Sequence, residues 1–157
     1  MTYFFSNYLE IRDTPKGKKT FAKIKFNKDD VIYEFVGERI KDIIPEDICC
    51  TQVGKNIFLK PSGLFEDHTN HSCNPNAFIR IVGNRTFLVA LYLINIGDEV
   101  TWDYSSSSTE DKSTFNMKCS CHKFLCRKEI SGFQYLTDEQ KQKYIDMGIV
   151  PDYLLVK

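Results

Sequence analysis

Seven consecutive residues near the middle of the chain carry a high concentration of polar chemistry. The run from Asn70 to Asn76 reads N-H-S-C-N-P-N and combines amides, an imidazole, a hydroxyl, a thiol and a proline. An ordinary turn does not require so many hydrogen-bonding groups. Two later segments carry chemistry that matches it: residues 97–104 read G-D-E-V-T-W-D-Y, and residues 119–126 add three thiols. Together these segments predict a cofactor pocket beside a metal site.

The thiols follow a metal-ligand pattern. Cys119, Cys121 and Cys126 are spaced C-x-C-x4-C, and Cys73 is a distant cysteine in a similarly polar, turn-rich context. Four thiolates suit a closed tetrahedral zinc site, which contributes folding energy and leaves no open position for catalysis. A set of free, buried cysteines is the alternative that the spacing alone leaves open.

Histidines offer a competing metal hypothesis. His68 and His71 are three residues apart and could bind a metal on one helical turn, which would support a hydrolase instead. No H-E-x-x-H pattern accompanies them. His122 could replace a thiol within the cysteine run, but we rank it below Cys73 because clusters of this kind usually complete themselves with sulfur.

Short strands must position these groups. Alternating apolar and polar residues predict strands over 8–12, 20–24, 31–36 and 52–59, and a hairpin of 77–82 with 85–94, whose second strand is buried on both faces. Residues 105–113 are polar and low in complexity, which predicts a mobile loop. Near the end, Thr137 and Gln140 predict a capping box at the start of a helix that stops at Gly148.

Length and composition limit the class of protein. The 157 residues fit one domain with a core of its own. Lys plus Arg and Asp plus Glu each number 21, so no global field marks a nucleic-acid or membrane partner. No apolar run approaches the roughly 20 residues of a membrane span, and no secretory leader is evident at the start. We therefore expect an intracellular, reducing compartment, with Cys49 and Cys50 as small buried hydrophobes.

These motifs, in this order, resemble the SET domain with its post-SET zinc motif. The central run 70–76, the segment 97–104 and the cysteines 119–126 with Arg127 carry the resemblance. Residues 16–22 (K-G-K-K-T-F-A) and 34–38 (E-F-V-G-E) occupy the places of the family's glycine-rich turn and E-Y-x-G-E segment. The resemblance spans roughly residues 8 to 130.

The resemblance implies a mainly β fold with short helices, built from small curved β-sheets with a knot-like C-terminal crossing and a zinc-stapled post-SET segment. Threading of that kind is rare among proteins, so the crossing rests on the resemblance and not on the strand pattern. The implied division is a SET domain at 1–114, a post-SET zinc-binding segment at 115–130 and a C-terminal helical tail at 131–157.

The resemblance also implies a protein-lysine N-methyltransferase that uses S-adenosylmethionine, with a histone tail as the expected substrate and chromatin regulation as the expected role. Tyr104 would be catalytic, Trp102 and Tyr104 would line the substrate channel, and the adenine would be held by backbone and side-chain hydrogen bonds of Asn70 and His71. The implied cofactor-binding residues are Gly17, Lys18, Lys19, Phe21, Asp67, Asn70, His71 and Tyr104. The implied ligands of a structural zinc are Cys73, Cys119, Cys121 and Cys126.

Some residues depart from the family pattern. Lys19 replaces the second glycine of the turn, which restricts the backbone and puts a side chain near the cofactor. Asp67 stands where relatives often carry a basic or imidazole group, and Phe35 replaces a frequent tyrosine. Trp102 lacks a hydroxyl yet narrows the channel, and these opposing effects leave the number of methyl groups open. Lys19 also motivates an alternative, a catalytically silent SET module that binds peptide or cofactor without turnover.

The expected partner is a basic protein or peptide segment laid as an added strand beside the channel. Acidic residues that could favour it are Glu38, Asp42, Glu46 and Asp47. We expect no direct contact with nucleic acid or membrane, and a monomer.

Overall fold

The computed structural model describes residues 7–41 and 50–156, and strands dominate it. The strands are β1 (Leu9–Thr14), β2 (Gly17–Ala22), β3 (Val31–Glu34), β4 (Arg39–Lys41), β5 (Thr51–Gly54), β6 (Ile57–Leu59), β7 (Asn70–His71), β8 (Ala77–Val82), β9 (Arg85–Ala90), β10 (Thr101–Trp102), β11 (Asn116–Lys118) and β12 (Glu129–Ser131). The helices are α1 (Asp138–Asp146), α2 (Asp152–Leu155) and 3₁₀ turns at Phe65–His68, Tyr104–Ser106 and Phe133–Tyr135. Within these ranges no helix is both long and apolar enough to cross a membrane. The expectation of a mainly β fold with short helices is confirmed.

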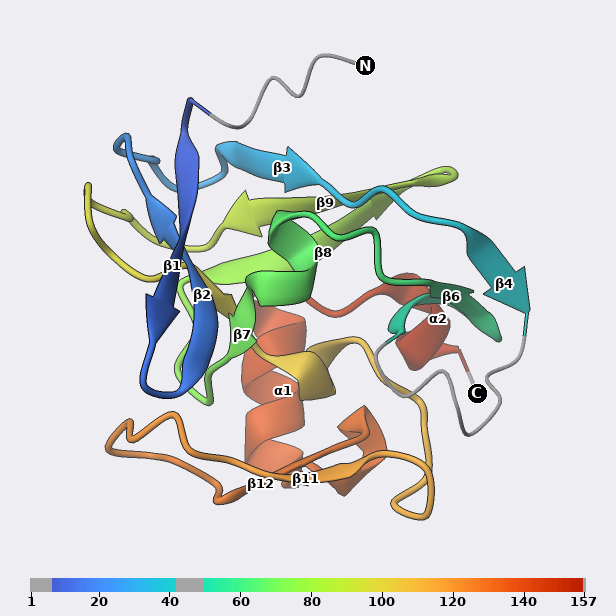
Figure 1. Cartoon of the computed structure of the whole chain (residues 1–157). Coiled ribbons are helices and arrows are strands. Elements are labelled where there is room, and N and C mark those ends of the chain that lie inside the picture. The colour runs from blue at the N-terminus through green and yellow to red at the C-terminus, as the bar shows by residue number, and fades with distance from the viewer. Residues whose placement is uncertain (1–6, 42–49, 157) are drawn as a thin grey trace.

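Over the described ranges the strands form several small sheets and no single large one (Figure 1). Two sheets have three strands, in the orders β3-β9-β8 and β4-β6-β5, and three are pairs: β1-β2, β7-β10 and β11-β12. The predicted hairpin of β8 and β9 is present and turns at Gly83-Asn84. Sheets this small cannot each enclose a core, so they are held together by packing against one another.

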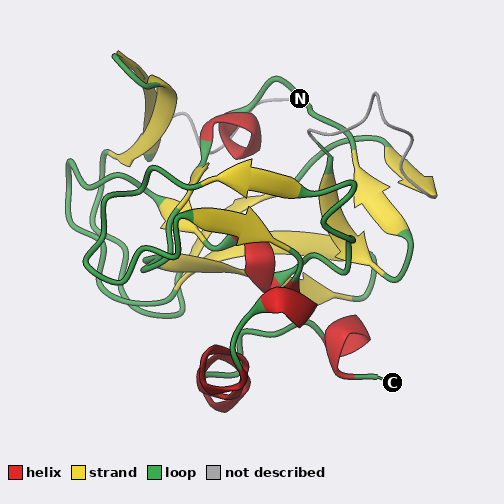
Figure 2. Cartoon of the chain, turned by 90° about the horizontal axis from the view of Figure 1, so that it is seen from below, coloured by secondary structure: helices red, strands yellow, loops and turns green. Residues whose placement is uncertain are grey.

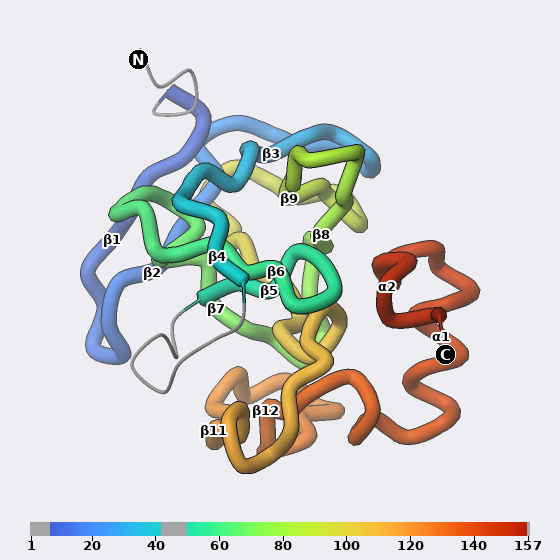
Figure 3. Tube along the Cα trace, turned by 90° about the vertical axis from the view of Figure 1, so that its right-hand side faces the viewer, coloured from blue at the N-terminus to red at the C-terminus, as the bar shows by residue number. Residues whose placement is uncertain are grey.

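The core surrounds β9. Leu88, Val89 and Ala90 are fully buried, so the predicted burial on both faces is confirmed for this part, although the strand ends at Ala90 and not at Ile94. One core cluster includes Leu88 and Trp102, and a second joins Val89 to side chains of the C-terminal helices. The tail packs on one side of the sheets, where α1 and α2 lie together in Figure 3 and α1 is seen end-on in Figure 2.

A parallel pair brings the two polar motifs together. In β7 and β10, Asn70 lies opposite Thr101 and His71 opposite Trp102. The next residue continues the contact, because the Ser72 amide donates to the Trp102 carbonyl at 3.0 Å. This pairing joins the central run to the segment that ends in Tyr104. The knot-like crossing and the domain boundaries at 114 and 130 stay predictions.

The single strand predicted over 52–59 is wrong: this stretch is the hairpin of β5 and β6. The chain turns at Lys55-Asn56, where Asn56 has a φ of 57°, and the pairing shifts register before Gly54. Asn adopts that left-handed conformation more readily than most residues, which makes the turn possible without glycine. Cys50 is half-buried, so it is less enclosed than expected, and Cys49 lies outside the described residues.

The mobile loop predicted over 105–113 is wrong in its first half. Ser105 to Ser108 are all buried, with side chains 1–4% exposed. The hydroxyls of Ser105, Ser106 and Ser108 find partners inside the protein; for example, Ser106 Oγ donates to the Asp103 carbonyl at 2.7 Å. A polar composition predicts exposure only when no neighbouring segment satisfies the polar groups, and here the C-terminal tail covers them.

The predicted helix start is confirmed. The Thr137 hydroxyl accepts from the Gln140 amide at 3.2 Å, and the Gln140 side chain accepts from the Thr137 amide at 3.1 Å. Gly148 follows the end of α1 with a φ of 66°. The capping box satisfies backbone donors that the first turn would otherwise leave unpaired.

We expect Thr137→Ala to lower the free energy of unfolding by about 1 kcal/mol, because the cap accepts one backbone hydrogen bond of the helix. Urea denaturation followed by circular dichroism measures it. Thr137→Ser is the matched control, since it keeps the hydroxyl and should remain close to wild type. Equal losses in both variants would mean that the methyl packing of Thr137 matters and the cap does not.

Candidate active site

Two cavities meet at Tyr104. The larger, about 700 Å³, is lined by Asn70 and His71 together with residues of the β1–β2 turn and of the cysteine segment. The smaller, about 370 Å³, is lined by Trp102 and by residues of β5. Tyr104 lines both cavities, and so does Met117 on β11. A side chain in this position can contact a ligand in either cavity.

Three contacts hold Tyr104 in place. It begins a 3₁₀ turn, and its hydroxyl donates to the Thr69 carbonyl at 2.9 Å. Its ring packs against Trp102, with centroids 4.8 Å apart, and edge-on to His71 at 5.4 Å. The tyrosine predicted to be catalytic is therefore fixed at both its ring and its hydroxyl.

The imidazole of His71 connects Tyr104 to the cysteine cluster. Its Nδ1 accepts from the Tyr104 amide at 3.2 Å, and its Nε2 lies 3.3 Å from Cys73 Sγ. A backbone N–H can only donate, so in the tautomer that this bond requires Nδ1 carries no proton and Nε2–H points to the sulfur. The same Nδ1 also lies 3.3 Å from Asp103 Oδ1. Burial lowers the pKa of His71 to about 4 despite the opposing charge of Asp103, so the neutral ring is the form present at neutral pH.

His71 therefore differs from the sequence expectation in one respect. Both of its ring nitrogens contact protein groups, so its side chain is not free to bind an adenine. Its backbone remains within the wall of the larger cavity. Asn70 lines the same cavity, and its Nδ2 donates to the Lys18 carbonyl at 3.1 Å, which joins β7 to the β1–β2 hairpin.

The four predicted metal ligands come together. The sulfur atoms of Cys73, Cys119, Cys121 and Cys126 all lie within 4.8 Å of one another. Cys73 and Cys119 are 3.6 Å apart, close to the roughly 3.8 Å expected between two thiolates of a tetrahedral zinc with ~2.3 Å bonds. This donor set fits one zinc ion with no open position.

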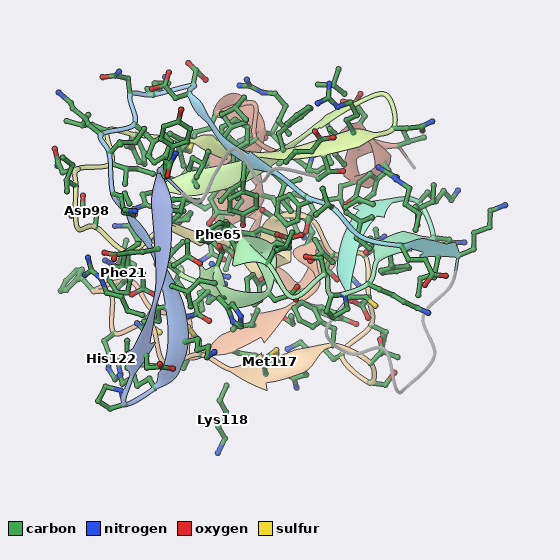
Figure 4. All side chains as sticks on the ribbon, turned by 45° about the horizontal axis from the view of Figure 1, so that its top comes forward. Phe21, Phe65, Asp98, Met117, Lys118 and His122 are labelled. Carbon is green, nitrogen blue, oxygen red and sulfur yellow. The ribbon has the colours of Figure 1, made fainter. Side chains whose placement is uncertain are left out.

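The thiols of the cluster differ in their pKa values. Burial alone would raise the pKa of Cys121, but hydrogen bonds from backbone groups and neighbouring thiols lower it to about 6, which favours the thiolate that a metal requires. Burial raises the pKa of Cys119 to about 11 and raises that of Cys73 as well, so these two sulfurs would lose their protons when the metal binds. His122 does not join the cluster. Its Nε2 forms a hydrogen bond with Lys16 Nζ, and Figure 4 shows His122 at the turn of the β1–β2 hairpin.

The histidine-based metal site is not formed. Among the residues that the structure describes, the cysteine cluster is the group of His, Cys, Asp and Glu placed to share an ion, and neither His68 nor His71 belongs to it. His68 ends a 3₁₀ turn, whereas both nitrogens of His71 face other partners.

Asp103 is a buried charge next to Tyr104, with 1% of its side chain exposed. Arg127 donates to both of its oxygens at 2.7 Å, and the Tyr144 hydroxyl donates at 2.6 Å. The Ser105 amide donates at 3.0 Å and so caps the 3₁₀ turn that carries Tyr104. The Arg127 amide also lies 3.4 Å from Cys73 Sγ. The sequence analysis did not predict a role for Asp103, although its position between Trp102 and Tyr104 indicated that it would lie near the site.

The structure brings together part of the predicted cofactor set. Lys19, Asn70, His71 and Tyr104 line the larger cavity. Gly17 and Lys18 adjoin it in the β1–β2 hairpin, but Phe21 does not line it and packs beneath the Arg12 guanidinium at 4.3 Å. Lining residues outside the predicted cofactor-binding set include Lys16, Tyr92, Asp98, Glu99, Lys118 and Lys123.

Lys19 fits its position without backbone strain. It lies within β2, paired with Arg12, and its φ is not in the positive region. Its Nζ donates to Glu99 Oε2 at 2.7 Å, and both side chains are about a quarter exposed. The ion pair holds the lysine side chain beside Glu99, shortly before β10, and both residues line the larger cavity.

Asp67 belongs to the other cavity. Its carboxylate accepts from the Gly63 amide at 2.5 Å and holds the turn before the 3₁₀ helix. It lines the smaller cavity beside Glu66, Trp102 and Tyr104 and does not line the larger one. Trp102 and Tyr104 were predicted to line the substrate channel, and both lie in the wall of this smaller cavity.

We expect Cys121→Ser to abolish stoichiometric zinc binding, because a thiolate is replaced by a hydroxyl that is a poor zinc ligand. Metal analysis of the purified protein measures it. Because Cys119 and Cys121 also line the larger cavity, affinity for S-adenosylmethionine should fall in the same variant.

Cys50→Ser is the matched control, since Cys50 lies outside the cluster and should leave the zinc content unchanged. Full cofactor affinity in zinc-free Cys121→Ser would refute the idea that the metal shapes this cavity.

Comparison with known proteins identifies the family. The sequence model of the SET domain matches residues 17–105. The chain is 29% identical over 125 residues to the "Histone-lysine N-methyltransferase, H3 lysine-4 specific" of Neurospora crassa, covering 68% of this chain and 9% of that protein. It is 24% identical over 125 residues to "Histone-lysine N-methyltransferase set-2" of Caenorhabditis elegans, covering 68% and 8%. The chain thus spans less than a tenth of the length of these curated relatives.

A solved structure shares the fold. The crystal structure of KRYPTONITE in complex with mCHH DNA, H3(1-15) peptide and SAH aligns with a TM-score of 0.64 at 22% identity, over 78% of this chain and 29% of that one. The expected fold of small β-sheets is therefore confirmed. With the family model matching more than half of its residues and the fold in agreement, the chain belongs to the SET domain family.

Proposed function

We propose that the chain is a protein-lysine N-methyltransferase that uses S-adenosylmethionine. The observation that carries this proposal is the position of Tyr104 in the wall of both cavities. A methyl transfer by in-line displacement needs donor and acceptor on opposite sides of the reacting carbon. Two cavities that share one tyrosine in their walls would provide a separate site for each. The names of the two relatives support the same activity.

The larger cavity suits the cofactor. Its volume of about 700 Å³ is within the range of small-molecule sites. It is lined by both cations and carboxylates, among them Lys16, Lys118, Asp98 and Glu99, and a zwitterionic amino-acid group needs both signs of charge. When bound, S-adenosylmethionine supplies an electrophilic methyl group on a sulfonium.

The residues around the smaller cavity would prepare the acceptor. Trp102, Tyr104 and Phe115 present aromatic surface there, which excludes water and favours the neutral amine that can act as a nucleophile. The hydroxyl of Tyr104 would orient that amine. Because its own position is fixed by Thr69, it needs little reorganisation during the reaction.

The charge of the smaller cavity favours a basic peptide. Among the described residues, its walls include Glu66, Asp67 and Glu110 and no lysine or arginine. Glu110 is half-buried, and burial raises its pKa although the Ser108 hydroxyl partly offsets this. We propose that the substrate is a lysine in a basic segment such as a histone tail. Of the acidic residues first considered, Glu38 is exposed, while Asp42, Glu46 and Asp47 lie outside the described residues.

The silent-module alternative loses its main support. It rested on Lys19, and the Lys19–Glu99 ion pair accommodates that residue beside the larger cavity. We retain the expectations of a monomer without direct nucleic-acid contact as proposals. A reducing, intracellular setting is likewise proposed, because a four-thiolate zinc site requires reduced cysteines.

We expect Tyr104→Phe to lower turnover by roughly 10²-fold or more, as removal of a group that positions or activates a nucleophile does. Affinity for S-adenosylmethionine should change little. Mass spectrometry of core histones and of a lysine-rich peptide library, incubated with the cofactor, detects the methyl increments.

Tyr8→Phe removes a hydroxyl far along the chain from the site and should retain activity. If Tyr104→Phe lowers turnover and cofactor affinity equally, the Tyr104 hydroxyl acts only in packing and not in the chemical step. If the wild-type protein binds the cofactor but produces no methyl increment, the result would favour the alternative, a catalytically silent SET module.

We expect Glu110→Gln to raise the KM for a basic peptide several-fold and to weaken its dependence on salt, since one carboxylate near the peptide is neutralised. Steady-state kinetics at low and high salt measure both effects. Glu139→Gln is the charge-matched control, because Glu139 is an exposed residue of α1. If Glu110→Gln leaves both the peptide KM and its dependence on salt concentration unchanged, Glu110 does not take part in substrate recognition.

A further inference from the structure

The C-terminal tail lies along the segment that carries Tyr104. The Tyr144 hydroxyl reaches Asp103, the Phe133 amide donates to the Ser108 carbonyl at 2.7 Å, and Gln134 Nε2 donates to the Glu110 carbonyl at 2.9 Å. A Cβ placed on Gly132 would lie 2.4 Å from the Glu110 carbonyl oxygen, so the two backbones are in direct contact there. The tail thus follows this segment from residue 103 to 110.

We propose that the tail supports the active site through its wall residues: Tyr144 positions Tyr104 through Asp103, and Tyr153 shapes the substrate cavity through Ser107 and Gln52. The inference rests on the proposed function and extends it to a region that the SET family match, residues 17–105, does not reach.

Tyr144 acts on the start of the segment. Its hydroxyl donates to Asp103 Oδ2 at 2.6 Å, and the other oxygen of the same carboxylate caps the 3₁₀ turn that begins at Tyr104. Burial and the neighbouring negative charge raise the pKa of Tyr144, so the hydroxyl keeps its proton and remains a donor. Without that donor the carboxylate keeps Arg127 but loses a constraint on its rotation.

Tyr153 acts on the end of the segment. Its hydroxyl lies 2.5 Å from the Ser107 carbonyl and 3.2 Å from the Gln52 carbonyl. Ser107 and Gln52 both line the smaller cavity, and they come from different elements. One hydroxyl from α2 therefore joins two walls of the proposed substrate site. Burial raises the pKa of Tyr153, which keeps it protonated.

A purely structural role would reside in the apolar packing and not in the hydroxyls. Tyr144 belongs to the second core cluster, together with Val89 and Leu136. Tyr→Phe substitutions keep the ring and remove only the hydroxyl, so they separate the two roles. Tyr135→Phe is the matched control. The Tyr135 hydroxyl donates to Asp111 at 2.7 Å, one residue after that segment, and neither residue is among those that line the two cavities.

The experiment compares Tyr144→Phe, Tyr153→Phe and Tyr135→Phe in the full chain. We expect Tyr144→Phe to lower kcat about tenfold with a near-unchanged peptide KM, since small displacements of a reacting group are costly. Tyr153→Phe should mainly raise the peptide KM. Tyr135→Phe should leave both constants near wild type.

A second readout does not require activity. Trp102 is the protein's single tryptophan and stacks beside Tyr104, so acrylamide quenching of its fluorescence reports on the site. Quenching should increase in Tyr144→Phe and Tyr153→Phe but not in Tyr135→Phe. The same quenching pattern in a protein with no methyltransferase activity would uphold the positioning role and reject the proposed function.

The inference is overturned if Tyr144→Phe and Tyr153→Phe keep wild-type quenching and kinetics while only their melting temperatures fall. Tyr153→Phe tests it independently should Tyr144→Phe fail to fold.

Discussion

The burial of the Asp103 carboxylate is the constraint on which the site depends. Removing an ion from water costs several kcal/mol unless its charge is compensated and its lone pairs are satisfied. Here the compensation comes from three places in the chain: Arg127 after the cysteines, Tyr144 on α1 and the Ser105 amide. Each of these segments must therefore reach Asp103 for the fold to be stable, and the residue that follows Asp103 is Tyr104.

The cysteine cluster is joined to the same point. Cys73 lies near the Arg127 amide and near His71 Nε2, while the opposite ring nitrogen accepts from the Tyr104 amide. A metal on the four sulfurs would fix the imidazole, and the neutral imidazole would fix the backbone of Tyr104. A structural zinc with no open position can in this way affect chemistry that it does not touch.

Charge separates the two cavities that meet at Tyr104. The larger has lysines as well as carboxylates in its wall, whereas the described residues of the smaller include carboxylates but no lysine or arginine. A small domain with no net charge can still recognise a cation if its charges are distributed unevenly. Aromatic faces around the acidic cavity add to that preference. The arrangement agrees with methyl transfer to a lysine of a basic peptide.

The sequence by itself determined the motifs, most strands and the capping box, because spacing and local hydrogen bonding fix these features over a few residues. Cys73 lies 46 positions before Cys119, so the four-sulfur set came from its polar context and from the resemblance, and the fold brought the sulfurs together. The tertiary structure decided what the sequence pattern could not. It buried Ser105 to Ser108 under the tail, placed Asp67 in the smaller cavity and turned the His71 ring toward Cys73 and Tyr104. It also made Asp103 the meeting point of distant segments. Such outcomes depend on which segments approach each other in space. The periodicity of residues along one stretch of chain does not predict those long-range contacts.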